Sequence, residues 1–450
     1  MSNRADAPGA SQAPRHWRPA LLLVITACAI ATCVGTAYTF VLVPLFGHFA
    51  GEFEDFSAYS QAAHAVAAGS SPYATFDSGT IVMSGFIYPP FAAVLLRPLD
   101  FLSARWQEIT WLWLSLGALV AGAVITGRAL LPAAWPRARI AIIVALTFPP
   151  ATYNLWHGQV NLVIFLLMAV ALSDYLSGHR TRCGIVLGVA ASIKLAPIVL
   201  LVVLARRGWW RAAAAGVATA AASVVVAVLA LGWNVTHQYV SSVFPYLNRD
   251  NGWIYNQTWN GVISRLAQHS VLANDVPSLW VHALATALSV GTVAALWLVV
   301  SSAQRSRAER GAEFACGIVA MLLVGSIAWY PVYVHLLIAL AAAAGLAYER
   351  AAHRRALTGW TVAALLGIGV VGAAVIASIS MQSIVAISTG PVWWLFLQAC
   401  SLPALLAAGL LVVMTRSLRG STSSQPLSPR RDALNVTSGI PLGDRPALVP

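Results

Sequence analysis

The stretch WWRAAAAGVATAAASVVVAVLAL, residues 209–231, is long, apolar and almost free of charge, with Arg211 as its single ionisable side chain. A run of about 18 or more apolar residues is long enough to cross a lipid bilayer. Backbone groups in lipid must bond to one another, so such a run crosses as a helix. The sequence therefore predicts a membrane-spanning helix here.

The whole chain has the composition of this stretch. Of its 450 residues, 59% are hydrophobic and 9% are charged, and the mean hydropathy is +0.74. Soluble domains carry about 25% charged residues. The fold expected is an all-α, polytopic integral membrane protein with about 10–12 transmembrane helices.

The net charge of +12 comes almost entirely from arginine. The arginines gather in short clusters between apolar segments, at Arg128 to Arg139, Arg180 to Arg182, Arg206 to Arg211, Arg305 to Arg310 and Arg350 to Arg355. This pattern is the topology signal of membrane proteins. A nucleic-acid partner is not expected, because no basic stripe interleaved with aromatic residues is present. The expected location is the plasma membrane.

Apolar windows divide the chain into candidate helices, at residues 20–45, 84–101, 106–128, 138–153, 159–177, 183–205, 211–232, 278–303, 312–329, 332–348, 357–378 and 391–415. Two of them contain helix breakers. Segment 84–101 carries three prolines, and segment 183–205 carries Lys194 and Pro197. Proline removes a helical hydrogen bond, so these two segments either cross or re-enter. Crossing gives about 12 spans and re-entry about 10, and the arginine distribution favours re-entry.

Outside the apolar segments the chain has two tails and two long polar loops. Residues 1–17 and 417–450 are expected to be disordered and cytoplasmic, around a membrane domain at 18–416. Loops 46–85 and 233–277 are expected on the same outer face. Residues 20–43 are read as an uncleaved first helix. The five cysteines show no CxxC spacing, so neither a disulfide framework nor a metal site is expected.

Polar residues near the membrane surface are the candidates for chemistry. Asp55, which lies directly after the first apolar segment, can act as a general base or can cap the helix that follows. Tyr88 precedes Pro89 and Pro90, a pair suited to a helix start. Gln159 and Asn161 can bond sugar hydroxyls or a lipid phosphate, or can cap the next helix.

Lys194 is the only lysine of the chain and lies within an apolar segment. Ionisable residues inside membrane segments are functional candidates, and a cation here suits an anionic ligand such as a lipid phosphate. The alternative is a lysine that extends to the interface. His335 can likewise pair with phosphate, or can be a packed core histidine. Aromatic residues alternate with amides at 253–261, as carbohydrate sites require, although an interfacial aromatic belt is the competing interpretation.

Five of these stretches, in this order, resemble motifs of glycosyltransferase family 87. The members of this family are integral membrane enzymes of the GT-C type. The matching residues are Asp55-x-x-x-Tyr59, Phe86-x-Tyr88-Pro89-Pro90-Phe91-Ala92-Ala93-Val94, Gly158-Gln159-x-Asn161, Lys194-Leu195-x-Pro197 and Asn256-Gln257-x-Trp259-x-Gly261-x-Ile263-Ser264-Arg265. Within the family, the pattern is similar to that of mannosyltransferases that use polyprenyl-phosphate mannose.

The resemblance implies an inverting sugar transfer on the outer membrane face, from a polyprenyl-phosphate sugar to a membrane lipid or glycan acceptor. No nucleotide, metal or other cofactor is implied. Asp55 would be the general base, and the donor phosphate would be bound by Lys194, Arg265 and His335. The sugar or acceptor would contact Tyr59, Tyr88, Gln159, Asn161, Asn256, Gln257 and Trp259. The chain departs from the pattern after Trp329, where Pro331 and Val332 replace a histidine pair.

Three other functions remain open on the sequence. One is a pentosyltransferase, such as an arabinofuranosyltransferase, of the same family. Another is a lipid or sugar transporter, although transporters tend to have broken helices in corresponding positions of two halves, and here both broken segments lie in the first half. The third is a non-catalytic partner in cell-envelope synthesis.

Overall fold

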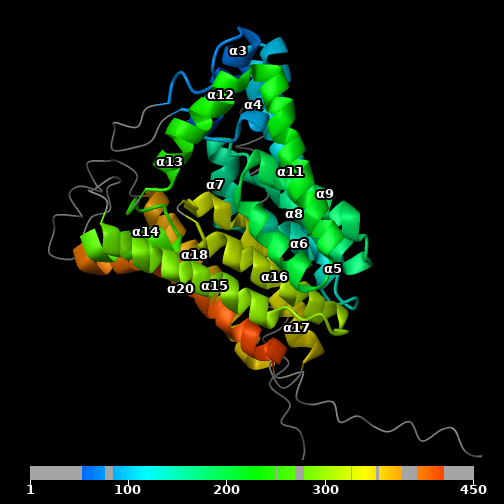
Figure 1. Cartoon of the computed structure of the whole chain (residues 1–450). Helices are drawn as coiled ribbons and strands as arrows, with labels where there is room; N and C mark the ends of the chain where they lie inside the picture. The colour runs from blue at the N-terminus through cyan, green and yellow to red at the C-terminus, as the bar shows by residue number, and fades with distance from the viewer. Residues whose placement is uncertain are drawn as a thin grey trace, which may run out of the picture.

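A computed structural model describes residues 53–76, 85–249, 251–268, 278–325, 327–350, 354–377 and 393–419. These residues form helices, together with one isolated antiparallel bridge between Asn256 and Trp329. The helices, shown in Figure 1, are α3 Glu54–Ala67, α4 Pro90–Leu96, η2 Arg97–Phe101, α5 Ala104–Leu130, α6 Arg137–Thr147, α7 Pro149–His157, α8 Asn161–Ser177, α9 Arg180–Ile193, η3 Ala196–Leu200, α10 Leu201–Arg206, α11 Trp210–Leu231, α12 Trp233–Gln238, η4 Tyr239–Val243, α13 Phe244–Leu247, α14 Trp259–Gln268, α15 Leu279–Val299, α16 Arg307–Leu323, η5 Tyr330–His335, α17 Leu336–Glu349, α18 Arg354–Ala377 and α20 Trp393–Arg419.

Five of the described helical stretches are long and apolar enough to cross a membrane. They are Ala104–Leu130, Trp210–Leu231, Leu279–Val299, Tyr330–Glu349 and Ser401–Arg419. The chain is therefore an all-α, polytopic membrane protein, as its composition predicts. The first predicted segment, 20–45, and both predicted tails lie outside the described residues, apart from 417–419 at the end of α20.

Segment 84–101 does not form a spanning helix. Its helical part consists of α4, with 7 residues, and η2, with 5. At 1.5–2 Å per residue the two together extend about 20 Å, less than the ~30 Å hydrocarbon core. Pro90 lies at the first position of α4, which confirms the predicted helix start after Tyr88.

The expectation of one continuous helix at 138–153 is wrong. The structure divides this segment into α6 and α7, and Phe148 between them is extended, with φ −80° and ψ 117°. Pro149 and Pro150 follow directly. A residue before proline is pushed out of the helical region by the proline ring, so the chain begins a new helix at Pro149.

Segment 183–205 is broken at Lys194, as predicted, and it folds back on itself. The guanidinium of Arg180, at the start of α9, lies 5.1 Å from the ring of Trp209, just after α10. The ring of Tyr175, near the end of α8, lies 5.2 Å from that of Trp209. Both ends of the α9–η3–α10 segment therefore lie at one end of the molecule. Lys194 forms the tip at the other end, which favours the re-entrant alternative.

Helices α9 and α11 run in the same direction and pack backbone to backbone. A Cβ atom on Gly184 would meet the carbonyl oxygen of Ala212 at 1.9 Å, and one on Gly188 would meet that of Gly216 at 2.5 Å. Small residues four apart allow such close packing between membrane helices. This contact holds the α9–η3–α10 segment, and with it Lys194, against the candidate spanning helix α11.

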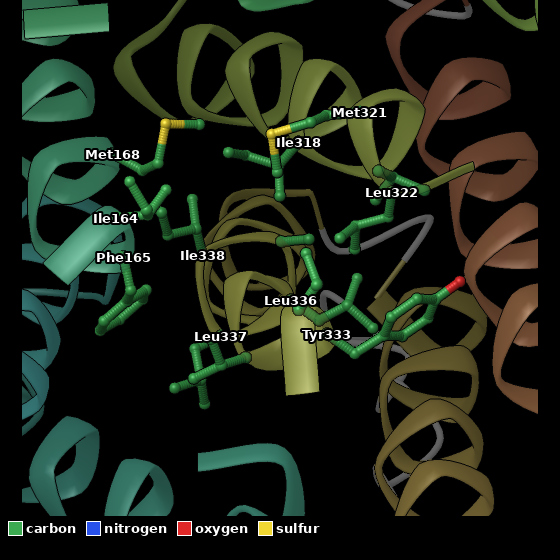
Figure 2. Close-up of a cluster of buried hydrophobic side chains, with 14 of the residues drawn as sticks. Ile164, Phe165, Met168, Ile318, Met321, Leu322, Tyr333, Leu336, Leu337 and Ile338 are labelled. Atoms are coloured by element: carbon green, nitrogen blue, oxygen red, sulfur yellow. The ribbon is translucent and has the colours of Figure 1, made fainter. Parts of the chain in front are cut away.

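Helix α17 lies at the centre of the molecule. Its residues Leu336, Leu337 and Ile338 pack with Ile164, Phe165 and Met168 of α8 and with Ile318, Met321 and Leu322 of α16 (Figure 2). In an 18-residue window of the span Tyr330–Glu349, 89% of the residues are buried, whereas the corresponding shares in α11 and α15 are only 17% and 22%. The outward faces of α11 and α15 are apolar, so they suit contact with lipid.

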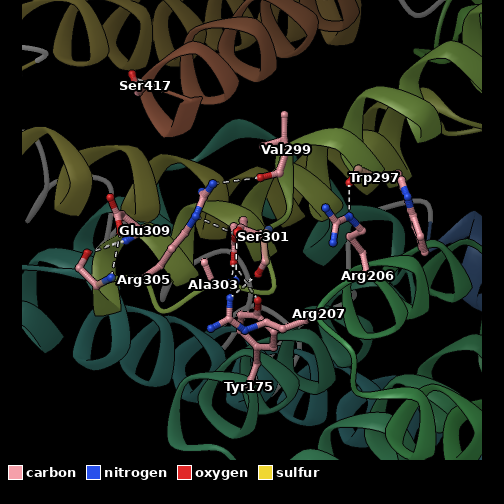
Figure 3. Close-up of polar contacts among 12 residues, drawn as sticks. Tyr175, Arg206, Arg207, Trp297, Val299, Ser301, Ala303, Arg305, Glu309 and Ser417 are labelled. Atoms are coloured by element: carbon pink, nitrogen blue, oxygen red, sulfur yellow. Dashed lines mark hydrogen bonds and ion pairs between the residues drawn. The ribbon is translucent and has the colours of Figure 1, made fainter. Parts of the chain in front are cut away.

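A buried ion-pair network fixes the end of the molecule opposite Lys194, here called the arginine-rich end (Figure 3). Glu313 of α16 is fully buried and accepts hydrogen bonds from Arg207 at 3.1 Å, from the Tyr175 hydroxyl at 3.1 Å and from the Ser301 backbone at 2.7 Å. Arg305 lies 3.3 Å from the same carboxylate. Buried charges are tolerated when paired in this way, and the network joins α8, α10 and α16.

Candidate active site

Asp55 lies inside helix α3 and does not cap it. The helix begins at Glu54, its N-cap residue is Phe53, and no side chain caps it. The Asp55 carboxylate instead accepts a hydrogen bond through Oδ2 from Gln159 Nε2, at 2.6 Å. The cap interpretation of Asp55 is therefore wrong, and its carboxylate points to residues far away in the sequence.

The turn that carries Gln159 is built on Gly158. Gly158 ends α7 in the left-handed region, at φ 68°, and its carbonyl accepts a 2.6 Å hydrogen bond from Trp111 Nε1. A Cβ atom at this position would lie 2.7 Å from Cβ of Phe56, on the first turn of α3. Only glycine lets α3 approach this turn so closely.

Gly158→Ala should therefore displace α3 and separate Asp55 from Gln159. A non-glycine residue in this backbone conformation costs on the order of 1 kcal/mol, and the contact with Phe56 adds to that cost. We expect a lower unfolding temperature and a loss of catalytic rate of at least tenfold. Gly178→Ala, at φ 82° with open space around its Cβ position, is the matched control for backbone strain alone. Equal rates in the two variants would contradict the proposed role of the close contact.

A continuous chain of side-chain hydrogen bonds joins Asp55 to Lys194. Lys194 Nζ donates to Asn161 Oδ1 at 2.7 Å, and Asn161 Nδ2 donates to Gln159 Oε1 at 2.5 Å. Gln159 in turn donates to Asp55. Helix α8 follows Val160 as its N-cap residue and has no side-chain cap, so the alternative that these amides cap the helix is not what the structure shows.

Two tyrosines complete this group of side chains. The Tyr59 hydroxyl donates to the Tyr88 hydroxyl at 2.8 Å and accepts from the backbone N–H of Val160 at 3.3 Å. The ammonium of Lys194 lies 5.7 Å from the centre of the Tyr88 ring, within the range of a cation–π contact. The Asp55–Lys194 cluster, as it is called below, consists of Asp55, Tyr59, Tyr88, Gln159, Asn161 and Lys194.

The cluster has unused hydrogen-bonding groups where ligands can reach them. Asp55, Tyr88 and Lys194 are partly exposed, whereas Tyr59, Gln159 and Asn161 are buried. Within the described part of the chain, Asp55 Oδ1 has no partner, and the Lys194 ammonium has one hydrogen bond for its three donors. Burial raises the pKa of Asp55, while the Gln159 hydrogen bond and the charge of Lys194 lower it and only partly offset the rise.

Arg265 and Asn256 make a second group of contacts. Arg265 is fully buried, and its Nη1 donates to the carbonyls of Trp253 and Asn256 at 2.9 and 2.7 Å. Asn256 is also fully buried; its Oδ1 accepts from the backbone N–H of Ala328, and its Nδ2 donates to the carbonyl of Asn251. These contacts hold two loops together, and they lend no support to the phosphate role predicted for Arg265.

The other predicted residues make contacts of their own. The carbonyl of Gln257 accepts from Tyr333, and Trp259 Nε1 donates to Thr292 of α15 at 2.9 Å. His335 is buried beside the Phe165 ring, with centroids 6.4 Å apart. His335 also lies near enough to Lys194 for the lysine's charge to act on its ring. The ligand roles of all these residues stay predictions.

Residues 86–326, which include the turn at Gly158 and the tip at Lys194, match the sequence model of glycosyltransferase family 87. The chain belongs to glycosyltransferase family 87. The match begins after Asp55 and Tyr59, so the placement of these two residues in the cluster comes from the structure.

Three mycobacterial proteins are similar to this family 87 chain. A polyprenol-phosphate-mannose-dependent alpha-(1-2)-phosphatidylinositol pentamannoside mannosyltransferase from Mycobacterium tuberculosis is 27% identical over 41% of this chain and 43% of its own length. Its counterpart from Mycolicibacterium smegmatis is 28% identical, over 41% and 45%. A phosphatidylinositol mannoside mannosyltransferase from M. tuberculosis is 29% identical, over 39% and 44%. The matched stretch thus spans less than half of each relative.

Among solved structures, the chain is similar to ArnT from Cupriavidus metallidurans bound to undecaprenyl phosphate. The identity is 15%, the TM-score is 0.41, and the similarity covers 90% of this chain and 78% of that one.

Two residues that hold the cluster in this family 87 protein, Asn154 and Trp111, are not predicted from the sequence. Asn154 is buried, accepts from Asn161 Nδ2 at 2.9 Å and donates to the carbonyl of Pro331 at 2.7 Å. Trp111 holds the Gly158 carbonyl. An asparagine at the edge of an apolar segment was a usable signal for Asn154, because amides are costly in lipid. Within the described residues, no group of His, Cys, Asp and Glu could hold a metal ion.

Proposed function

We propose that the protein is a membrane glycosyltransferase that moves a sugar, with mannose the first candidate, from a polyprenyl-phosphate donor to a membrane lipid or glycan acceptor. Asp55 is the general base and Lys194 binds the donor phosphate. The observation that carries the proposal is the hydrogen-bonded connection from a carboxylate to an ammonium, each with free bonding capacity. Family membership and the similarity to mycobacterial polyprenol-phosphate-mannose-dependent mannosyltransferases support the choice of donor.

The proposed reaction needs one proton acceptor and one stabilised leaving group. Asp55 Oδ1 accepts the proton of an acceptor hydroxyl, and the oxygen of that hydroxyl forms a bond to the anomeric carbon of the sugar. The bond between that carbon and the phosphate oxygen breaks, and the oxygen keeps the electron pair. Lys194 stabilises the resulting polyprenyl phosphate by a charge-assisted hydrogen bond. A single displacement of this kind inverts the anomeric centre.

The outer face of the membrane is the proposed place of transfer. The two predicted outer loops meet in the structure, where Ser71 donates to Gln238 at 2.6 Å and the rings of Tyr73 and Tyr239 lie 5.7 Å apart. Helix α3, which carries Asp55, belongs to the first of these loops. The clusters at Arg180 and Arg206 lie at the arginine-rich end, and positively charged loops favour the cytoplasm.

The test is to incubate the purified protein in lipid with polyprenyl-phosphate sugars of several kinds and with extracted envelope lipids as acceptors. We expect free polyprenyl phosphate and a glycosylated lipid with the mannose donor. Turnover with a pentose donor instead would select the arabinofuranosyltransferase alternative. Movement of the intact donor across the bilayer without release of polyprenyl phosphate would select the transporter and would contradict the proposal.

A further inference from the structure

The two amides between Asp55 and Lys194 can be arranged in only one consistent way. An ammonium can only donate hydrogen bonds, and a carboxylate can only accept them. Asn161 must therefore turn its oxygen to Lys194, which leaves its nitrogen for Gln159. Gln159 then presents its oxygen to Asn161 and its nitrogen to Asp55, as observed.

We propose that Asn161 and Gln159 form an oriented amide relay, in which the Lys194 ammonium and the side-chain oxygen of Asn154 together set the direction of both amides so that Asp55 faces an N–H group. This inference rests on the proposed function and deepens it, because it makes the two amides positioning residues for the base. It replaces the role of sugar ligand that the sequence suggests for them. Asp55 Oδ1 is then left for the acceptor hydroxyl.

Further contacts hold the relay in place. Asn161 Nδ2 also donates to Asn154 Oδ1 at 2.9 Å, and Asn154 Nδ2 donates to the carbonyls of Pro150 and Pro331 at 2.6 and 2.7 Å. Asn154 is thereby fixed by two backbone acceptors and can offer Asn161 only its oxygen. Asn161 and Asn154 are fully buried and Gln159 is 3% exposed. Burial strengthens such hydrogen bonds and makes a mismatched one costly.

The relay also has a simple electrostatic setting. Among the described residues, Lys194 is the charged group that acts on the ionisation of Asp55. Tyr59 and Tyr88 are the titratable groups next to it that respond to its charge. The helices packed against α3 carry further charged or titratable side chains. These are Arg97 and Asp100 on η2, Arg105 and Glu108 on α5, and His157 on α7. Asp100 pairs with His64, on the last turn of α3.

Asn161→Asp tests the relay by replacing the side-chain NH2 of Asn161 with an oxygen. The introduced carboxylate still accepts from Lys194 but can donate neither to Gln159 nor to Asn154. Gln159 then has an acceptor on both sides, so one carboxylate faces an amide oxygen. Because the introduced carboxylate would lie beside the ammonium and stay ionised, Asp55 would bind its proton more tightly. We expect the acidic limb of the pH profile of kcat, where the rate falls as the base is protonated, to move to higher pH by on the order of one unit.

Gln159→Met removes the last link without adding charge and should shift the limb in the same direction. The double variant Asn161→Asp/Gln159→Met distinguishes an effect passed through the Gln159 hydrogen bonds from a direct electrostatic effect of the new charge on Asp55. If the shift passes through Gln159, adding Asn161→Asp to Gln159→Met should move the limb by less than about 0.3 unit more, because coupled residues are not additive. The donor KM of Gln159→Met should stay within about threefold of wild type.

Gln238→Glu is the control for an added acid on the same side of the protein. Gln238 lies on α12 and accepts a hydrogen bond from Ser71, outside the cluster, so the limb of this variant should not move. Two results would overturn the relay and leave the proposed function standing. One is that Asn161→Asp shifts the acidic limb equally in the wild-type and Gln159→Met backgrounds. The other is that both single variants change the donor KM but leave the acidic limb where it is. If Asn161→Asp does not fold, an unmoved limb in Gln159→Met overturns the relay. A wild-type protein that transfers no sugar overturns the proposed function together with the relay.

Discussion

Asp55→Asn should abolish sugar transfer and leave the fold intact. Loss of a general base typically lowers the rate by about 10²–10⁴-fold. Because burial raises the pKa of Asp55, folding makes the ionised carboxylate less favourable than it is in the unfolded chain. Its folded pKa lies above the unfolded value, so replacing it by a neutral amide should leave the unfolding temperature equal or higher at neutral pH. Both quantities can be measured on protein purified in detergent.

The same pKa shift sets the expected pH dependence of the wild type. The base must be ionised to accept a proton, so the rate should fall as the pH drops through the pKa of Asp55. That midpoint should lie above the ordinary range of aspartate, since the pKa is raised. Asp100→Asn is the matched control, because Asp100 lies on neighbouring η2 and pairs with exposed His64 at 3.0 Å. An Asp55→Asn variant within about threefold of the wild-type rate would show that Asp55 is not the base.

Lys194→Met should raise the KM for the polyprenyl-phosphate donor by roughly ten- to a hundredfold, as expected for one lost charge-assisted hydrogen bond. Lys194→Arg should raise it less, because guanidinium keeps the charge but differs in shape from an ammonium. The KM for the acceptor should change little in either variant. Initial rates at varied donor concentration, with the acceptor saturating, give the comparison.

Arg249→Met is the control for the loss of an exposed cation, since Arg249 lies in the loop after α13 and its guanidinium stacks 5.2 Å from the Tyr246 ring. Its donor KM should equal that of the wild type. If Lys194 has no phosphate to bind, Lys194→Met should instead leave the donor KM unchanged and raise the unfolding temperature, because a partly buried cation is removed. That result would end the phosphate assignment.

The position of the breaks in the chain could be read only in part from sequence. Lys194 and Pro197 marked a real interruption. The break at Phe148 was overlooked because its two prolines lie inside a strongly apolar window, where hydropathy outweighs backbone geometry. Whether segment 183–205 crosses or returns depended on packing, through contacts such as that of Arg180 with Trp209. Composition carries no information about such pairings.

The sequence by itself determined the environment and the family. Its apolar runs require helices in lipid, because backbone groups there have no water to bond, and its ordered motifs predicted family 87, which the match over residues 86–326 confirms. These properties are local or compositional, so they can be read without knowing which residues meet.

Only the tertiary structure decided which candidate residues form one site. Asp55 and Lys194 are far apart in the chain. They are joined because the left-handed turn at Gly158 lets α3 dock beside Gln159, while the folded-back segment α9–η3–α10 brings Lys194 to Asn161. Arg265 and Asn256 looked equally suited to ligands, yet both bond to backbone groups of neighbouring loops, and Arg265 also donates to the Ser401 side chain. A polar side chain has the same chemistry in either place, and its partners are set by long-range packing.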